Sequence, residues 1–158
     1  MSTYLRRPLG IRLVMARLWW KIAQPQTLGV KVAVVVNRDQ ILLVKPLGVA
    51  QWTFPGGGIK RRESPVEAAI RELQEETAIH LSQSDLHLIG VYFSRRESKS
   101  DHIFMFVTNL DVAPSFVADA KEIESIGLFA IDNLPEDVAP SVTRRLGELA
   151  CRSLSSAW

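Results

Sequence analysis

The segment GGGIKRRESPVEAAIRELQEETAI, residues 56–79, constrains this chain more than any other part of its sequence. Three consecutive glycines precede a helical pattern in which Glu72, Glu75 and Glu76 lie within five residues. Like charges three or four positions apart on a helix destabilise it by roughly 0.2–0.5 kcal/mol per pair. The apolar residues of this helix form one stripe, at Val66, Ala69, Ile70, Leu73 and Thr77. The pattern predicts a helix that packs on a core through the stripe, with its carboxylates facing outward beside a glycine turn.

Clustered carboxylates next to a glycine turn are typical of a site for a hard divalent cation and a phosphate. Mg²⁺ in proteins binds through a few carboxylates together with substrate phosphates, and its charge would relieve the repulsion between the glutamates. Glu63, just before the helix, adds a fourth carboxylate. Consecutive glycines let the backbone approach a ligand and turn N–H groups toward an anion. Arg71 has the spacing to pair with Glu75 or Glu67. The alternative is a solvated acidic helix face that binds nothing.

The composition is that of an ordinary globular protein. Of 158 residues, 47% are apolar and 23% are charged, so we expect a full hydrophobic core. The single cysteine, Cys151, excludes an internal disulfide framework and a zinc site built from cysteines. The apolar run from Leu9 to Trp20 is interrupted by Arg12 and Arg17, so it reads neither as a membrane span nor as a signal peptide. We therefore expect a cytoplasmic protein.

Hydrophobic periodicity predicts the secondary structure. Strands are expected at 30–36, 40–45, 86–95, 102–110 and 125–131. Helices are expected at 11–22, from Ser64–Pro65 to about 77, and from a cap at Ser141 or Thr143 to about Leu154. Strands and helices alternate without regular βαβ units, which favours an α/β fold of the α+β kind, a mixed sandwich. We divide the chain into an arm, residues 1–27, and a domain, residues 28–158.

The N-terminal arm is basic and amphipathic. Residues 1–38 have a charge of +7 and the remainder −5, against +2 overall. The apolar positions of the arm follow helical spacing, at Ile11, Val14, Met15, Leu18, Trp19 and Ile22. We expect this face to pack on the domain or on a second subunit. Contact with an anionic membrane surface or with the phosphates of a nucleic acid is the alternative.

Three residues outside the glycine–glutamate segment are candidates for substrate binding. Trp52 and Phe54 precede the glycines and could stack on a nucleobase, although aromatic residues alternating along an extended segment more often lie in a core. Arg95 ends a predicted strand and could contact phosphate, with a solvated loop edge as the favoured interpretation.

The glycine–glutamate segment resembles the Nudix box, G-x5-E-x7-R-E-U-x-E-E-x-G-U, in which U is a bulky aliphatic residue. The matching residues are Gly57, Glu63, Arg71, Glu72, Leu73, Glu75, Glu76 and Ile79. Two positions depart from the pattern. Ala78 replaces the late glycine, which is unfavourable if that position requires positive φ, and Arg62 replaces a glycine that often precedes the first glutamate. We expect these departures to adjust geometry or selectivity without abolishing catalysis.

The resemblance implies an α/β/α sandwich around a mixed β-sheet. It also implies hydrolysis of a nucleoside diphosphate linked to another moiety, with Mg²⁺ or alternatively Mn²⁺. By position, Glu75 and Glu76 would be the main metal ligands, and Glu72 a further ligand or the general base. Glu63 would support the metal site, Arg71 would orient a glutamate, and Gly57 would offer its carbonyl. The family's base sometimes lies in a later loop, where Glu122 and Glu124 are the candidates and an exposed charge is the alternative.

The glycines Gly56 and Gly58 would border the phosphates of a nucleotide-type substrate, with a nucleoside triphosphate or nucleotide sugar expected. Two other classes compete with this enzyme. A non-catalytic nucleotide sensor with a Nudix-like domain would be expected to lose box glutamates, and this sequence has them all. An adaptor that acts through the basic arm would leave the box unexplained. We expect a homodimer.

Overall fold

The computed structural model describes residues 26–96 and 99–151, so the predicted arm helix at 11–22 lies outside the described residues. The strands are β1 (Gln26–Val36), β2 (Gln40–Pro46), β3 (His87–Arg96), β4 (Lys99–Leu110) and β5 (Ile123–Ala130). The helices are α2 (Pro65–Thr77), the short 3₁₀ turn η1 (Gln83–Asp85) and α3 (Pro140–Cys151). The five strands form one sheet in the order β3-β4-β1-β2-β5, with β1 parallel to β4 and the other pairs antiparallel. The predicted mixed sheet and α/β class are confirmed.

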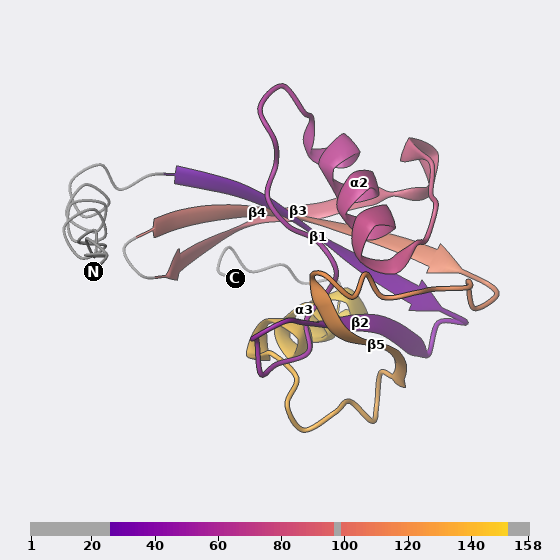
Figure 1. Cartoon of the computed structure of the whole chain (residues 1–158). Coiled ribbons are helices and arrows are strands. Elements are labelled where there is room, and N and C mark those ends of the chain that lie inside the picture. The colour runs from indigo at the N-terminus through magenta and orange to yellow at the C-terminus, as the bar shows by residue number, and fades with distance from the viewer. Residues whose placement is uncertain (1–25, 97–98, 152–158) are drawn as a thin grey trace, which may run out of the picture.

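The central strand β1 is buried on both faces. Val30, Val32 and Val34 belong to the apolar cluster that includes the inward side chains of α2. Ala33 and Val35 belong to a second cluster that includes those of α3. Figure 1 shows α2 and α3 on opposite sides of the sheet. A nearly continuous apolar run such as VKVAVVV is typical of a strand covered on both faces, and the α/β/α arrangement follows from it.

Strands β1 and β2 pair only near the turn that joins them. Their register is limited to Val35 with Ile41 and Val36 with Gln40. Farther from the turn the strands separate, and residues 53–59 fill the gap between them. This gap fixes where the glycine turn lies, directly against the edge of β1.

Helix α2 has a defined start and end. Ser64 caps its first turn and exchanges hydrogen bonds with Glu67, and Pro65 is the first helical residue, as predicted. At its C-terminal end Ala78 adopts the left-handed conformation, with a φ of +59°, and its N–H donates to the Gln74 carbonyl. This conformation is ordinarily a glycine position.

Element bounds differ from the predictions by a few residues. Strands β1 and β4 begin earlier than expected because they pair in parallel from Gln26 with Ser100 onward. Helix α3 begins at Pro140, ahead of the predicted caps Ser141 and Thr143. Among the helices of the described ranges, none combines the length and hydrophobicity that a bilayer crossing requires.

Candidate functional site

The glycine turn is bound to the edge of β1 by backbone hydrogen bonds. Val30 N–H donates to the Gly57 carbonyl at 2.9 Å, and Ile59 N–H donates to the Leu28 carbonyl at 3.0 Å. Gly56 has a φ of +133°, and a Cβ there would lie 2.3 Å from the Val30 carbonyl oxygen. Only glycine lets the chain pass β1 this closely.

The same turn covers two carboxylates of α2. Gly56 N–H donates to Glu76 Oε2 at 2.8 Å. A Cβ on Gly57 would lie 2.6 Å from Glu72 Oε2. Glu72 and Glu76 are 9% and 7% exposed, so the expectation that these carboxylates face outward is wrong, and only Glu75 of the three is exposed. The glycine turn covers the part of α2 beside the apolar stripe, so little solvent reaches these two carboxylates.

Arg71 connects the acidic residues of this site. Its Nε and Nη2 donate to the two oxygens of Glu63 at 2.6 and 2.9 Å. Its Nη1 donates to Glu72 at 2.6 Å and to Glu75 at 2.9 Å, and Nη2 also reaches the Gly58 carbonyl at 3.0 Å. The hydrogen bonds from Arg71 lower the pKa of Glu63 to about 2. One guanidinium therefore holds three carboxylates beside the glycine turn.

Glu76 carries a buried charge that its surroundings only partly offset. Burial raises the pKa of Glu76, and the charge of Glu72 acts in the same direction. The ammonium of Lys31 and the N–H of Gly56 act against this increase. Lys31 extends from β1 and donates to the carbonyls of Phe54 at 2.7 Å and Gly56 at 2.8 Å, while burial lowers its own pKa. A further cation near Glu76 would favour its ionised form.

The two candidate bases outside the box lie in different environments. The loop before β5 crosses the end of α2, where Asp119 N–H donates to the Glu76 carbonyl at 3.3 Å. The charge of Glu122 raises the pKa of Glu76, after the larger effect of burial. The charge of Glu124 acts instead on Lys45. The charge of Glu122 therefore acts on one of the box carboxylates, Glu76.

One cavity opens beside the glycine turn, and a second cavity adjoins it. The smaller, about 260 Å³, is lined by Gly57 and Gly58, and the larger, about 700 Å³, extends to the start of α3. Both are lined by Lys31, Asp101 and Ile103. The other polar side chains of the larger cavity are Gln51, Thr53, Ser94, Ser141 and Arg144. Sequence reasoning assigned no role to these residues, although Lys31 gives a signal as the one charge within VKVAVVV.

The donor set has the chemistry that a hard divalent metal ion requires. It consists of carboxylate oxygens and backbone carbonyls. Glu72 Oε2 and Glu76 Oε1 accept no hydrogen bond from the described part of the chain. Within residues 26–96 and 99–151, no three acidic, histidine or cysteine side chains already converge to hold a metal ion. Glu63, Glu72 and Glu75 face Arg71 instead, so metal binding would require these side chains to turn from it.

The family model described as NUDIX domain matches residues 27–148. The chain belongs to the Nudix family. A Bacillus subtilis protein provisionally named 8-oxo-dGTP diphosphatase is 33% identical over 122 residues, which cover 77% of this chain and 78% of that protein. An RNA pyrophosphohydrolase of Psychrobacter cryohalolentis is 44% identical over only 50 residues, which cover 32% of this chain and 29% of that protein.

The fold agrees with this assignment. A solved MutT Nudix hydrolase of Burkholderia pseudomallei is 26% identical, with a TM-score of 0.64 and coverage of 79% of this chain and 98% of that one. The family relationship makes the chain a Nudix pyrophosphohydrolase. Nudix hydrolases act on nucleotide-type substrates and generally use divalent metals such as Mg²⁺ or Mn²⁺.

The aromatic residues before the Nudix box belong to the core. Phe54 is fully buried among the residues that α3 covers, so the stacking role considered for it is wrong. The ring of Trp52 packs edge-on against Phe129, with centroids 4.8 Å apart. Arg95 lies in the last part of β3, and the position of its side chain is outside the described residues.

Both departures from the Nudix pattern lie at positive φ. Arg62 has a φ of +68° and Ala78 a φ of +59°. A non-glycine residue in the left-handed region costs roughly 1–2 kcal/mol. The fold therefore keeps the backbone that glycine would favour and tolerates the strain.

Replacement of Ala78 by glycine is expected to stabilise the protein by about 0.5–1 kcal/mol, because relief of the strain exceeds the entropy that glycine loses on folding. Thermal unfolding should show a rise in Tm of roughly 1–4 °C. Ala113→Gly is the control, since Ala113 is exposed and has no positive φ. An equal or lower Tm for Ala78→Gly would contradict the prediction.

Proposed function

We propose that the protein is a Mg²⁺-dependent hydrolase that cleaves the diphosphate linkage of a nucleoside triphosphate. The observation that carries the proposal is the Arg71-centred set of glutamates, held against a glycine turn that lines the smaller cavity. Carboxylates for a cation and backbone for a diphosphate then lie together at the glycine turn, which lines the smaller cavity. A nucleotide sugar is the alternative substrate, and Mn²⁺ the alternative metal.

The residues that would hold the metal ion are Glu72, Glu75 and Glu76, with Glu63 supporting them through Arg71. The Gly57 carbonyl accepts from Val30 and retains a second lone pair for this purpose. A bound divalent cation would offset the charge of the diphosphate and polarise the phosphorus under attack. The glutamates that turn toward the cation would exchange a hydrogen bond from Arg71 for a bond to the metal, and Arg71 would orient the glutamate that stays beside it.

Glu122 is the base that we propose outside the box. Its charge acts on Glu76, its side chain is exposed, and the loop that carries it is bound to the end of α2. Its carboxylate would take a proton from the water that attacks phosphorus. Glu124 is also a glutamate, two residues farther along the chain, and its charge acts on Lys45. Its replacement by glutamine is therefore a matched control.

The larger cavity would receive the nucleoside. Its volume of about 700 Å³ suits a nucleotide-sized ligand, and its lining combines the acidic Asp101, the basic Lys31 and Arg144, and neutral polar groups. The name of the Bacillus subtilis relative, a diphosphatase of a modified deoxynucleoside triphosphate, favours triphosphates over nucleotide sugars. A cytoplasmic location and a homodimer remain predictions.

The test is release of phosphate and pyrophosphate from a panel of nucleoside triphosphates and nucleotide sugars. Wild type should turn over triphosphates with Mg²⁺ and lose activity when the metal is chelated, and Glu75→Gln should be strongly impaired. Glu122→Gln should lower kcat by about 10²–10⁴-fold, as expected on removal of a general base, with Glu124→Gln near wild type. The reverse order of these two variants would make the base assignment wrong. Nucleotide binding without turnover by wild type would favour the sensor.

A further inference from the structure

Toward its β3 edge the sheet has an apolar face that no element of the described residues covers. Four large apolar side chains are between 41% and 53% exposed on β1 and β3. We name them the open face: Leu28, Leu88, Val91 and Phe93. Single exposed apolar side chains are ordinary, but a contiguous group of them marks a contact surface.

Strand register shows that these side chains form one surface. Leu28 pairs with His102, and His102 pairs with Phe93, so these residues lie in one row across three strands. Val91 pairs with Phe104 in the next row. Directly paired residues project to the same side of a sheet. The ring centroids of Phe93 and His102 are 5.4 Å apart, so the two side chains pack against each other within this row.

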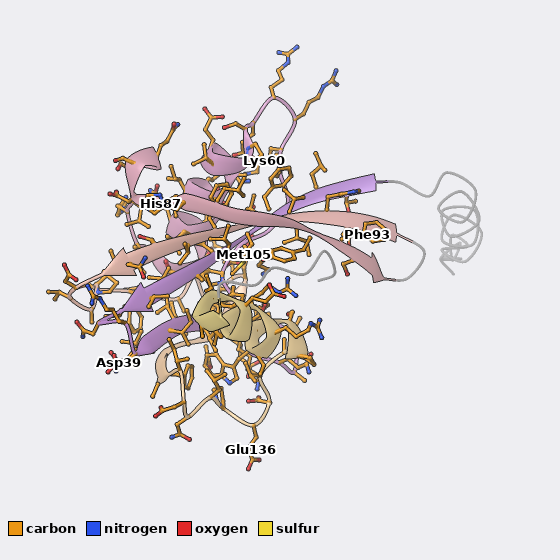
Figure 2. All side chains as sticks on the ribbon, turned by 180° about the vertical axis from the view of Figure 1, so that it is seen from behind. Asp39, Lys60, His87, Phe93, Met105 and Glu136 are labelled. Atoms are coloured by element: carbon orange, nitrogen blue, oxygen red, sulfur yellow. The ribbon has the colours of Figure 1, made fainter. Side chains whose placement is uncertain are left out.

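The open face lies on the α2 side of the sheet but beyond the reach of α2. In its next row, Leu88 pairs with Phe106, which is only 5% exposed and belongs to the cluster that α2 covers. Figure 2 shows Phe93 on the part of the strands that extends past both helices. The core under α2 therefore continues laterally into the open face without a covering element among the described residues.

We propose that residues 11–22 of the same chain form a helix that covers the open face. The segment has an apolar stripe, which includes Leu18 and Trp19, and it ends four residues before Gln26, where β1 begins. Pro25 provides a place for the chain to reverse. Leu28 follows two residues into β1, so the segment is attached at the border of the surface it would cover.

Length and charge match this arrangement. A 12-residue helix is about 18 Å long, and β3 runs roughly 17 Å from Leu88 to Phe93. The three rows contain no side chain that carries a full charge at neutral pH, and His102 is their one titratable group. The basic residues Arg17 and Lys21 lie opposite the apolar stripe and would remain in water.

The test is cross-linking in the full chain, after Cys151→Ser removes the single native thiol. Leu18→Cys combined with Phe93→Cys should give a cross-link within one chain when treated with a short bismaleimide. Leu18→Cys with Val117→Cys is the control, because Val117 is 67% exposed on the loop bound to the far end of α2. A cross-link between two chains would assign the open face to a second copy and overturn the proposal. Equal cross-linking in both pairs would also overturn it.

A second measurement does not depend on the cysteines. Leu18→Asp should lower Tm by roughly 4 °C or more and increase binding of an apolar dye, since the open face would lose its cover. Unchanged Tm and dye binding would contradict the proposal. Binding to a membrane surface would give a different combination of results. Wild type would sediment with phosphatidylglycerol vesicles, Leu18→Asp would not, and the Leu18→Cys/Phe93→Cys protein would give no intrachain cross-link. These results together would overturn the proposal.

Discussion

Replacement of Glu76 by glutamine is expected to abolish most activity and yet to raise the stability of the metal-free protein. Glutamine keeps an oxygen to accept from Gly56 N–H, now at 2.8 Å, but removes a buried charge. Loss of a residue that only hydrogen-bonds a metal ligand lowers metal affinity or activity by roughly 10–100-fold. Loss of Glu76, which we propose as a ligand itself, should have at least as large an effect. We therefore expect kcat/KM to fall by about 100-fold or more, while Tm in a chelating buffer rises.

The stability gain should depend on pH in a defined direction. Burial raises the pKa of Glu76 above 4.5, so its ionised form destabilises the fold at pH values above the raised pKa. Below 4.5 both folded and unfolded states are protonated, and this contribution disappears. The Tm difference between Glu76→Gln and wild type should therefore be largest near neutral pH and shrink on acidification. Glu136→Gln, at an exposed loop position, is the control for both assays. A lower metal-free Tm for Glu76→Gln would contradict the account.

Alanine substitutions in the glycine turn should have three different outcomes. At Gly56 the new Cβ would lie 2.3 Å from the Val30 carbonyl oxygen and 2.9 Å from the Lys31 Cα, both backbone atoms of the central strand. Strain at positive φ and overpacking each cost about 1–3 kcal/mol. We expect Gly56→Ala to lose about 3–5 kcal/mol, or roughly 6–20 °C in Tm.

The two neighbouring glycines separate stability from activity. At Gly57 the new Cβ would meet the carboxylate of Glu72 at 2.6 Å, and this flexible side chain can move at little cost in stability. Displacement of Glu72 should lower kcat by roughly 10–100-fold. At Gly58 a Cβ meets nothing within 4 Å, so Gly58→Ala should resemble wild type in Tm. A Gly56→Ala protein as stable as Gly58→Ala would contradict the close approach to β1.

Residue spacing was sufficient to predict the chemistry of the candidate site but not the exposure of its residues. The interval from Glu63 to Arg71 and the glutamates after it identified a shared acidic site, and the structure joins these residues in one hydrogen-bonded group. A helical wheel indicated that Glu72 faces solvent, whereas the glycine turn buries it. The wheel describes one helix and carries no information about a loop that crosses it.

The two possible bases illustrate the same limit. Glu122 and Glu124 are two residues apart in the sequence, on either side of Ile123, where β5 begins. The structure adds that the loop before Glu122 is bound to the end of α2 and that the charge of Glu122 acts on Glu76, which the sequence does not reveal. For Lys31 the sequence does give a signal, because it is the one charged residue in an apolar strand. The structure adds its hydrogen bonds to the carbonyls of Phe54 and Gly56.

The sequence by itself determined the elements of the described ranges and the acidic group on α2, because these depend on periodicity and on spacing within single elements. The mixed β-sheet was implied by the resemblance to the Nudix family. It also determined where glycine was needed, although not why. Tertiary structure alone decided which carboxylates are buried and where the cavities open. These properties arise where β1, the glycine turn and the loop before β5 meet, and such contacts join residues far apart in the chain. Local patterns do not encode distances between segments that are brought together only by packing.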